Sequence, residues 1–375
     1  MGRRVFISGN IAIAEAALRA GCNFYAGYPI TPSSDLMEHM ARELPKRGGI
    51  FIQGEDEIAS INMIIGASIA GAKAMTATSG PGFSLMQEGI GLAIMLEVPI
   101  VIVDVMRLGP ATGQATKSGQ GDVMQARWGR HGDQYLVVYS ASNVYEAYIY
   151  TIEAFNTAEK LRTPVVLLID ELTGHLTETI EIPDEIEVID RVWTEESTKF
   201  FDSDDFRIPP PMPKIGIGLN ILYTGSTHDG YGFRKTQDAE VHSRLVNRLK
   251  RKIIDNASWL FKYEVFDWDD YVNIGFITYS SVFRSVLDAS RALREEGYSV
   301  GILKLNTLWP IKYDILSKYV NNADMIIVPE MNLGQLIHDV RIASKHDRIY
   351  QYNKIGGGIP IYPSELVRYV KEVIK

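Results

Sequence analysis

A regular alternation of apolar runs and helical patterns constrains the fold of this chain more than any other feature. Over residues 1–175, apolar runs of strand length recur between segments whose apolar residues follow the helical period. Continuous apolar strands separated by helices are typical of a parallel sheet covered on both faces. Strands are expected at 4–8, 23–26, 49–53, 74–78, 99–105, 135–139 and 164–170, and helices at 12–19, 36–43, 58–70, 84–96 and 144–160.

The alternation divides the chain into three parts. Residues 1–177 are predicted to form a doubly wound α/β domain. Residues 178–254 are expected to be an acidic, proline-rich linker or surface arm, because residues 178–206 hold eleven acidic and two basic side chains and prolines follow at 209–213. A basic stretch at 244–252 within this part predicts a solvated helix face, with a docking patch for an acidic partner as the alternative. Residues 255–375 resume the alternation and predict a second, smaller parallel-sheet domain, so the expected fold class is α/β with two doubly wound domains.

Charge and composition exclude several classes of function. The 375 residues include 46 acidic and 38 basic side chains, for a net charge of −8, so a nucleic-acid partner is not expected. The longest apolar stretch, 90–106, is interrupted by Glu97, Pro99 and Asp104, so no membrane span is predicted. Cys22 is the only cysteine, and the seven histidines show no metal-ligand spacing, so no metal site is expected on this chain. With no secretion signal at the start, a cytoplasmic location is predicted.

Two motifs at strand ends indicate an anion site. Thr31-Pro32 follows the predicted strand 23–26 and is expected to cap the next helix, which would place a hydroxyl group and free backbone N–H groups at a sheet edge. Arg107 follows the strand 99–105 and opens a glycine- and threonine-rich loop that runs to Gly121. A guanidinium there can bind a carboxylate through two hydrogen bonds. An ordinary helix cap and an ordinary surface arginine remain the alternatives.

Two further motifs indicate a buried carboxylate beside a tight turn. Glu57 begins an almost wholly apolar segment, 58–72, so burial is expected to raise its pKa. Compensation of the helix dipole is the alternative role. Gly80 and Gly82 lie in a strand-to-helix turn that matches no phosphate-binding fingerprint but permits close approach of a flat ligand or a partner subunit. Because the carboxyl ends of parallel strands meet at one sheet edge, these motifs together predict a site for a small anionic substrate.

The motifs resemble a known family, the α subunit of 2-oxoacid:ferredoxin oxidoreductases. The resemblance covers nearly the whole chain, and its most specific motif is Tyr-Pro-Ile-Thr-Pro at 28–32. In the first domain it rests on residues 9–12, 28–34, 54–57, 78–82 and 121–127, and in the last on 275–280, 305–310 and 329–335. It implies a thiamine diphosphate "pyrimidine" domain followed by a domain like the transketolase C-terminal domain.

The resemblance also implies a role for each matching residue. Glu57 would hydrogen-bond the N1′ atom of the thiamine aminopyrimidine and favour the imino tautomer that takes up a proton. Thr31 and Arg107 would hold the substrate carboxylate, and Thr116 would line the same pocket. The implied cofactor-binding residues are Tyr28, Pro29, Glu57, Gly80 and Gly82.

Features that the chain lacks imply partner subunits. It has no Gly-Asp-Gly segment followed by Asn, with which thiamine enzymes hold the diphosphate and Mg²⁺. The resemblance therefore implies a β subunit that shares thiamine diphosphate and carries Mg²⁺, further γ- and δ-type subunits, iron–sulfur clusters on partner chains, ferredoxin as electron acceptor and coenzyme A as acyl acceptor.

The resemblance favours one substrate over its relatives. Segments 227–230 and 238–244 look most like the 2-oxoglutarate type, which implies oxidative decarboxylation of 2-oxoglutarate to succinyl-CoA. The cation that binds the distal carboxylate would then come from the β subunit. The alternatives are pyruvate or a branched-chain 2-oxoacid, and a non-catalytic scaffold. A nucleotide-binding electron-transfer module is disfavoured because no dinucleotide fingerprint is present.

Overall fold

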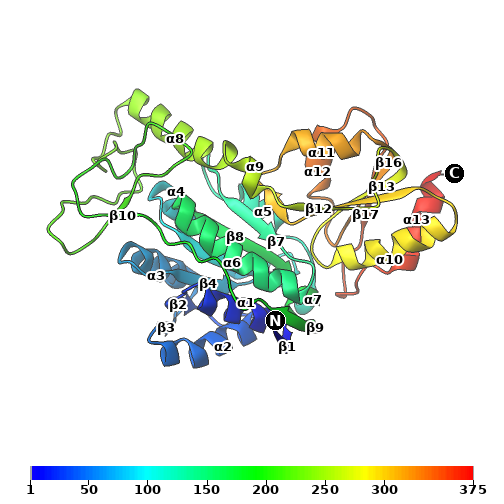
Figure 1. Cartoon of the computed structure of the whole chain (residues 1–375), viewed down its shortest axis with the longest axis horizontal. Helices are drawn as coiled ribbons and strands as arrows, with labels where there is room; N and C mark the ends of the chain where they lie inside the picture. The colour runs from blue at the N-terminus through cyan, green and yellow to red at the C-terminus, as the bar shows by residue number, and fades with distance from the viewer. Residues whose placement is uncertain (1, 375) are drawn as a thin grey trace.

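The computed structural model describes residues 2–374 and contains two parallel sheets that lie side by side (Figure 1). The larger sheet has eight strands. Its strands are β2 (Phe24–Gly27), β3 (Ile50–Gln53), β4 (Ala74–Thr78), β5 (Ile100–Leu108), β6 (Gln114–Ser118), β7 (Val137–Ser140), β8 (Pro164–Asp170) and β15 (Thr307–Trp309). The order is β15-β7-β8-β5-β4-β2-β3, with β6 paired to β5; β15 and β6 are antiparallel to their neighbours and the other pairs are parallel.

Helices cover both faces of this sheet, as the apolar strands require. The helices of this region are α1 (Gly9–Arg19), α2 (Ser34–Glu43), α3 (Glu57–Ile69), α4 (Gly80–Met95), α5 (Val123–Trp128), α6 (Val144–Leu161) and α7 (Glu171–His175), with a short 3₁₀ turn at Pro45–Arg47. The helices α3 and α4 share one buried apolar cluster, and α1, α2 and α6 share another. The sheet therefore separates two cores.

The smaller sheet is built in the same way. Its order is β12-β14-β13-β16-β17, from β12 (Tyr263–Phe266), β13 (Val272–Thr278), β14 (Val300–Leu305), β16 (Ala323–Glu330) and β17 (Ile349–Asn353). Only β12 is antiparallel to its neighbour. Its helices are α10 (Val282–Glu295), α11 (Tyr313–Val320), α12 (Ile337–Ala343) and α13 (Pro363–Ile374). The apolar residues of α11 and α12 join the α3–α4 cluster of the larger sheet, so the two domains share a core.

Residues 178–254 pack against the first domain more closely than their acidity predicts. They include most of β9 (Thr177–Ile182), β10 (Trp193–Thr194), β11 (Met212–Pro213) and α8 (Ala239–Ile254), and the short α9 (Ala257–Leu260) follows. Two arginines hold this arm: Arg191 forms a buried ion pair with Glu159, and Arg162 Nη1 donates to the carbonyl oxygens of Phe200 and Pro210 at 2.9 and 2.7 Å. The arm is therefore anchored to the first domain by buried contacts at these positions.

The basic stretch on α8 corrects one prediction. Arg244 and Arg251 are exposed, as a solvated helix face requires. Arg248 and Lys252 are buried, and both bind the carboxylate of Glu97. The prediction was wrong for these two residues because their counter-charge lies about 150 positions away in sequence, inside an apolar stretch.

The first strand corrects another prediction. Residues 4–8 do form a strand, β1 (Arg3–Ser8), but it lies outside the parallel sheet. It pairs antiparallel with β9 in a separate two-stranded sheet, with Val5 opposite Ile180. No residue of this strand is fully buried, whereas a central strand of a parallel sheet is covered on both faces.

Candidate active site

Glu57 lies at the start of α3, at the carboxyl edge of the larger sheet. The chain leaves β3 at Gln53, and the Asp56 carboxylate caps the helix by accepting a hydrogen bond from the backbone N–H of Ala59 at 2.7 Å. Glu57 is only 4% exposed. Burial, and after it the charge of Asp56, raise the pKa of the Glu57 carboxyl, while Arg107 opposes the shift. This carboxyl group therefore keeps its proton to a higher pH than an exposed glutamate.

The turn between β4 and α4 approaches this carboxylate closely. A Cβ atom on Gly82 would lie 2.3 Å from Glu57 Oε1 and 2.1 Å from Thr78 Oγ1, so no side chain fits there. The buried hydroxyl groups of Thr78 and Ser79 find no hydrogen-bond partner among residues 2–374. Buried polar groups are normally paired, so unpaired hydroxyls beside a carboxylate indicate a place for a polar ligand.

Thr31 and Arg107 are also brought together. Arg107 is 7% exposed, and its Nη1 donates to the backbone oxygen of Thr31 at 2.8 Å. The predicted cap was wrong, because α2 begins three residues later, at Ser34, and the peptide bond between Thr31 and Pro32 is cis. Asn10 holds this turn by donating from Nδ2 to the backbone oxygen of Pro32 at 2.8 Å. Arg107 therefore contacts the turn at Thr31, and its charge acts on the Glu57 carboxyl.

The structure does not bring every predicted site residue to this cluster. Gly80 begins α4 and lies beside Asp122. Tyr28 and Pro29 are exposed after β2, and Thr116 is exposed on β6. The expected long loop from Arg107 to Gly121 is instead partly an antiparallel hairpin of β5 and β6. Roles for Tyr28, Pro29 and Thr116 stay predictions.

Two buried aspartates belong to the cluster and were not predicted as site residues. Asp104 is fully buried in the middle of β5, and Asp122 lies immediately before α5. Burial, and after it the charge of Asp122, raise the pKa of Asp104 well above its usual range. Burial also raises the pKa of Asp122, to about 6. An acidic residue in the middle of a continuous apolar strand was the sequence signal that could have identified Asp104.

The second domain binds residues 120–121, the segment that immediately precedes Asp122. The Gln120 backbone N–H donates to the Met331 backbone oxygen at 2.9 Å, and the Met331 backbone N–H donates to Gln120 Oε1 at 3.0 Å. Asn332 Nδ2 donates to the Gln120 oxygen at 2.8 Å, and Gln335 Nε2 donates to the Gly121 oxygen at 2.7 Å. We call these contacts the interdomain clamp. A cavity of about 470 Å³ lies between this clamp and Arg107.

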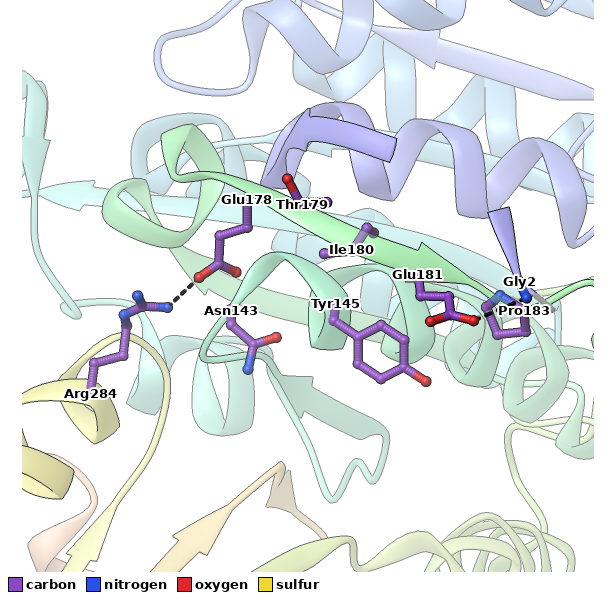
Figure 2. A pocket seen from close by; sticks show the side chains of 9 residues that line it. All are labelled: Gly2, Asn143, Tyr145, Glu178, Thr179, Ile180, Glu181, Pro183 and Arg284. Atoms are coloured by element: carbon purple, nitrogen blue, oxygen red, sulfur yellow. Dashed lines mark hydrogen bonds and ion pairs between the residues drawn. The ribbon is translucent and has the colours of Figure 1, made fainter. Parts of the chain in front are cut away.

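A larger surface hollow lies away from the cluster. It has a volume of about 710 Å³ and is lined by β9, the start of α6 and Arg284 of α10. Figure 2 shows Arg284 paired with Glu178, and the Gly2 backbone paired with Glu181. No predicted site residue lines this hollow. Within residues 2–374, no group of three or more His, Cys, Asp or Glu side chains is placed to hold a metal ion, and no helix has the length and apolarity needed to cross a membrane.

Comparison with known proteins identifies the family. The family described as "Pyruvate flavodoxin/ferredoxin oxidoreductase, thiamine diP-bdg" matches residues 15–248, and "Pyruvate:ferredoxin oxidoreductase core domain II" matches residues 272–366. The 2-oxoglutarate synthase subunit KorA of Methanocaldococcus jannaschii is 48% identical over 368 residues, which cover 97% of this chain and 98% of the relative. The chain belongs to the 2-oxoacid:ferredoxin oxidoreductase family. The predicted family and the predicted α/β fold class are thus confirmed.

Other members of the family are more distant. The ketoisovalerate oxidoreductase subunit VorB of Methanothermobacter thermautotrophicus is 33% identical over 98% of this chain and 97% of the relative. Among solved structures, a 2-oxoglutarate:ferredoxin oxidoreductase from Magnetococcus marinus, with 2-oxoglutarate, coenzyme A and succinyl-CoA bound, is 34% identical with a TM-score of 0.93. It covers 99% of this chain, which spans 65% of that longer chain. A split-gene transketolase, 12% identical with a TM-score of 0.58 over 98% of both chains, shares the fold alone.

Proposed function

We propose that this chain is the α subunit of a 2-oxoglutarate:ferredoxin oxidoreductase. The complex would convert 2-oxoglutarate and coenzyme A to succinyl-CoA and CO₂, and two oxidised ferredoxins would each accept one electron. The observation that carries the reaction class is the buried Glu57 carboxyl, which faces unpaired hydroxyl groups and a turn that admits no side chain. The choice of substrate rests on identity, which is 48% to a 2-oxoglutarate synthase subunit and 33% to a ketoisovalerate oxidoreductase subunit.

The residues around Glu57 fit the aminopyrimidine of thiamine diphosphate. A flat heterocycle needs partners for its polar edge, which Glu57 and the unpaired hydroxyl groups of Thr78 and Ser79 offer. Gly82, which has no side chain, lets the turn lie against Glu57 and Thr78. When bound, thiamine diphosphate supplies the nucleophilic carbon and the electron sink that decarboxylation of a 2-oxoacid requires. Glu57 would hold a proton at the N1′ edge of the ring, and burial, which raises the pKa of its carboxyl, favours the protonated form that this role requires.

Arg107 would bind the carboxylate next to the 2-oxo group of the substrate. Its Nη1 is occupied by the Thr31 backbone, while its buried Nε finds no acceptor within residues 2–374. A buried donor without an acceptor is costly, and a substrate carboxylate would supply the missing acceptor. This arrangement would orient the substrate so that the bond to be broken lies beside the Glu57 turn.

The remaining chemistry would reside on partner subunits. A single cysteine is too few to ligate an iron–sulfur cluster, and the chain has no Gly-Asp-Gly segment followed by Asn to hold a diphosphate and Mg²⁺. We therefore propose a β subunit that completes the cofactor site with Mg²⁺, further γ- and δ-type subunits, and partner chains that bring the clusters and contact ferredoxin. A cytoplasmic location stays a prediction.

The test is an activity assay on the complex purified through this chain without oxygen. Coenzyme A-dependent reduction of a viologen dye would be measured with 2-oxoglutarate, pyruvate and 2-oxoisovalerate in parallel. The proposal expects a strong preference for 2-oxoglutarate. Activity only with another acid would overturn the substrate and keep the reaction class.

A variant of Glu57 distinguishes a catalytic role of this chain from a non-catalytic scaffold role. Glu57→Gln keeps the size of the side chain but cannot exchange a proton, so the complex should assemble and lose activity. Full activity of this variant would instead support a non-catalytic scaffold role for the chain. Glu38→Gln, on the exposed surface of α2, serves as the control.

A further inference from the structure

The segment between β6 and α5 forms one wall of the cavity beside Arg107. This segment, residues 119–122, is neither helix nor strand, and all of its residues line the cavity of about 470 Å³ together with Arg107. Ser118, which immediately precedes it, lies opposite Arg107 in the register of β5 and β6. A Cβ atom on Gly119 would be 3.0 Å from the Cα atom of Leu108, so the segment packs closely against β5. The position of residues 119–122 therefore sets the space that is open beside the Arg107 side chain.

Gln120 holds this segment through hydrogen bonds of its backbone and of its side chain. It is fully buried, and its backbone N–H, backbone oxygen and Oε1 bind Met331 and Asn332 of the second domain in the interdomain clamp. Its Nε2 donates to Oδ2 of Asp170, the last residue of β8 in the first domain, at 3.0 Å. The side chain thus donates to one domain and accepts from the other, which an amide can do and a carboxylate or a thioether cannot.

Two buried acidic residues hold the partners of Gln120 in place. Asp170 Oδ2 also accepts a hydrogen bond from Ser281 Oγ of the second domain at 2.6 Å. Glu330, at the end of β16, accepts a hydrogen bond from Asn332 Nδ2 at 3.0 Å. All of these residues are at least nine-tenths buried, and a buried polar network whose members are hydrogen-bonded is rigid. Gln120 is the residue through which this network reaches the cavity wall.

We propose that Gln120 is a positioning residue for substrate binding, which fixes the cavity wall so that Arg107 meets the carboxylate of a 2-oxoacid in one geometry. Gln120 acts through residues 119–122, because its backbone and side-chain polar groups already bind protein partners. A displaced wall would weaken the binding of substrate and transition state alike, which raises KM and leaves kcat unchanged. The identity of the substrate rests on the proposed function, but the anchoring of the segment by Gln120 does not.

The first test is hydrogen–deuterium exchange followed by mass spectrometry on the purified complex. Gln120→Met keeps the length of the side chain and removes both of its side-chain hydrogen bonds, so the amides of residues 119–124 should exchange about tenfold faster than in wild type. The control Arg284→Met breaks the ion pair between α10 and Glu178, away from the cavity, and should leave the exchange of this segment unchanged. Equal exchange in Gln120→Met and wild type would overturn the proposal.

The second test distinguishes positioning from a purely structural role. Gln120→Met should raise the KM for 2-oxoglutarate about tenfold and change kcat by less than about twofold, whereas a loss of folded complex would lower kcat at constant KM. An unchanged KM would overturn the positioning role even if exchange is faster. If Gln120→Met does not assemble, Gln120→Asn, whose side chain is too short to reach both partners, should give the same two results. A wild-type complex inactive with every acid would count against the proposed function, while the exchange result still decides whether Gln120 anchors the segment.

Discussion

Removing the charge of Glu97 should destabilise the chain more than any surface ion-pair change. Glu97 is fully buried, and its carboxylate binds Arg248 through both oxygens and Lys252 Nζ at 2.8 Å. Glu97→Gln keeps the shape and leaves two buried cations without a counter-charge. Breaking a buried ion pair costs about 3–5 kcal/mol, and two stranded cations favour the upper end. At about 2–4 °C per kcal/mol for a large domain, the melting temperature should fall by roughly 10 °C.

Thermal unfolding followed by circular dichroism checks this magnitude. Glu195→Gln is the control, since Glu195 forms a solvent-exposed pair with Lys214 that should contribute little to stability. Adding Arg248→Met and Lys252→Met to Glu97→Gln should restore much of the loss, because these two positions then no longer hold buried cations without their counter-charge. A melting temperature for Glu97→Gln equal to that of the control would refute the reasoning.

Three further predictions concern Glu57, Gly82 and the pH dependence of Glu97. Glu57→Gln should lower the turnover rate about 10²- to 10⁴-fold with an unchanged circular dichroism spectrum; a rate near wild type would exclude proton exchange at this residue. Gly82→Ala should also abolish activity, because its Cβ would overlap Glu57 and Thr78, whereas Gly66→Ala, in open space on α3, should keep full activity. The ion pairs with Arg248 and Lys252 hold the pKa of Glu97 in the folded chain far below its unfolded value of 4.5. The ionised Glu97 carboxylate therefore stabilises the fold above pH 4.5, and this contribution is lost as the pH falls toward the folded pKa. Urea unfolding at falling pH should therefore show the gap between wild type and Glu97→Gln narrowing, and a constant gap would contradict this.

The parallel sheets and the core of the site were predictable because the local sequence patterns match the structure that these segments adopt in the fold. Buried parallel strands appear in a sequence as continuous apolar runs, and their carboxyl ends meet at one edge of the sheet. The sequence alone therefore groups Glu57, Gly82 and Arg107. The same logic failed for residues 4–8, whose partner β9 lies within the acidic arm. Strand pairing between distant segments leaves no local pattern.

The parts that were missed depend on contacts between segments far apart in the chain. Arg248 and Lys252 follow a polar helical pattern, and only their contact with Glu97 shows that they are buried. Asp104 interrupts an apolar stretch, but no local pattern shows that the charge of Asp122 acts on it. The sequence shows Glu97 and Asp104 as charges inside an apolar stretch, but it does not show which side chains lie near them.

The interdomain clamp has a consequence for how this chain can be divided. The strand β15 comes from the C-terminal part of the chain yet completes the edge of the larger sheet, and Met331, Asn332 and Gln335 bind the segment that ends at Asp122. A protein cut near residue 255 would separate two folded-looking halves, but the N-terminal half would lose both a sheet strand and the contacts that fix the segment after Arg107. The two halves therefore form one functional unit. A chimera that replaces only the first domain to change substrate preference would also have to include the residues of the second domain that form the interdomain clamp.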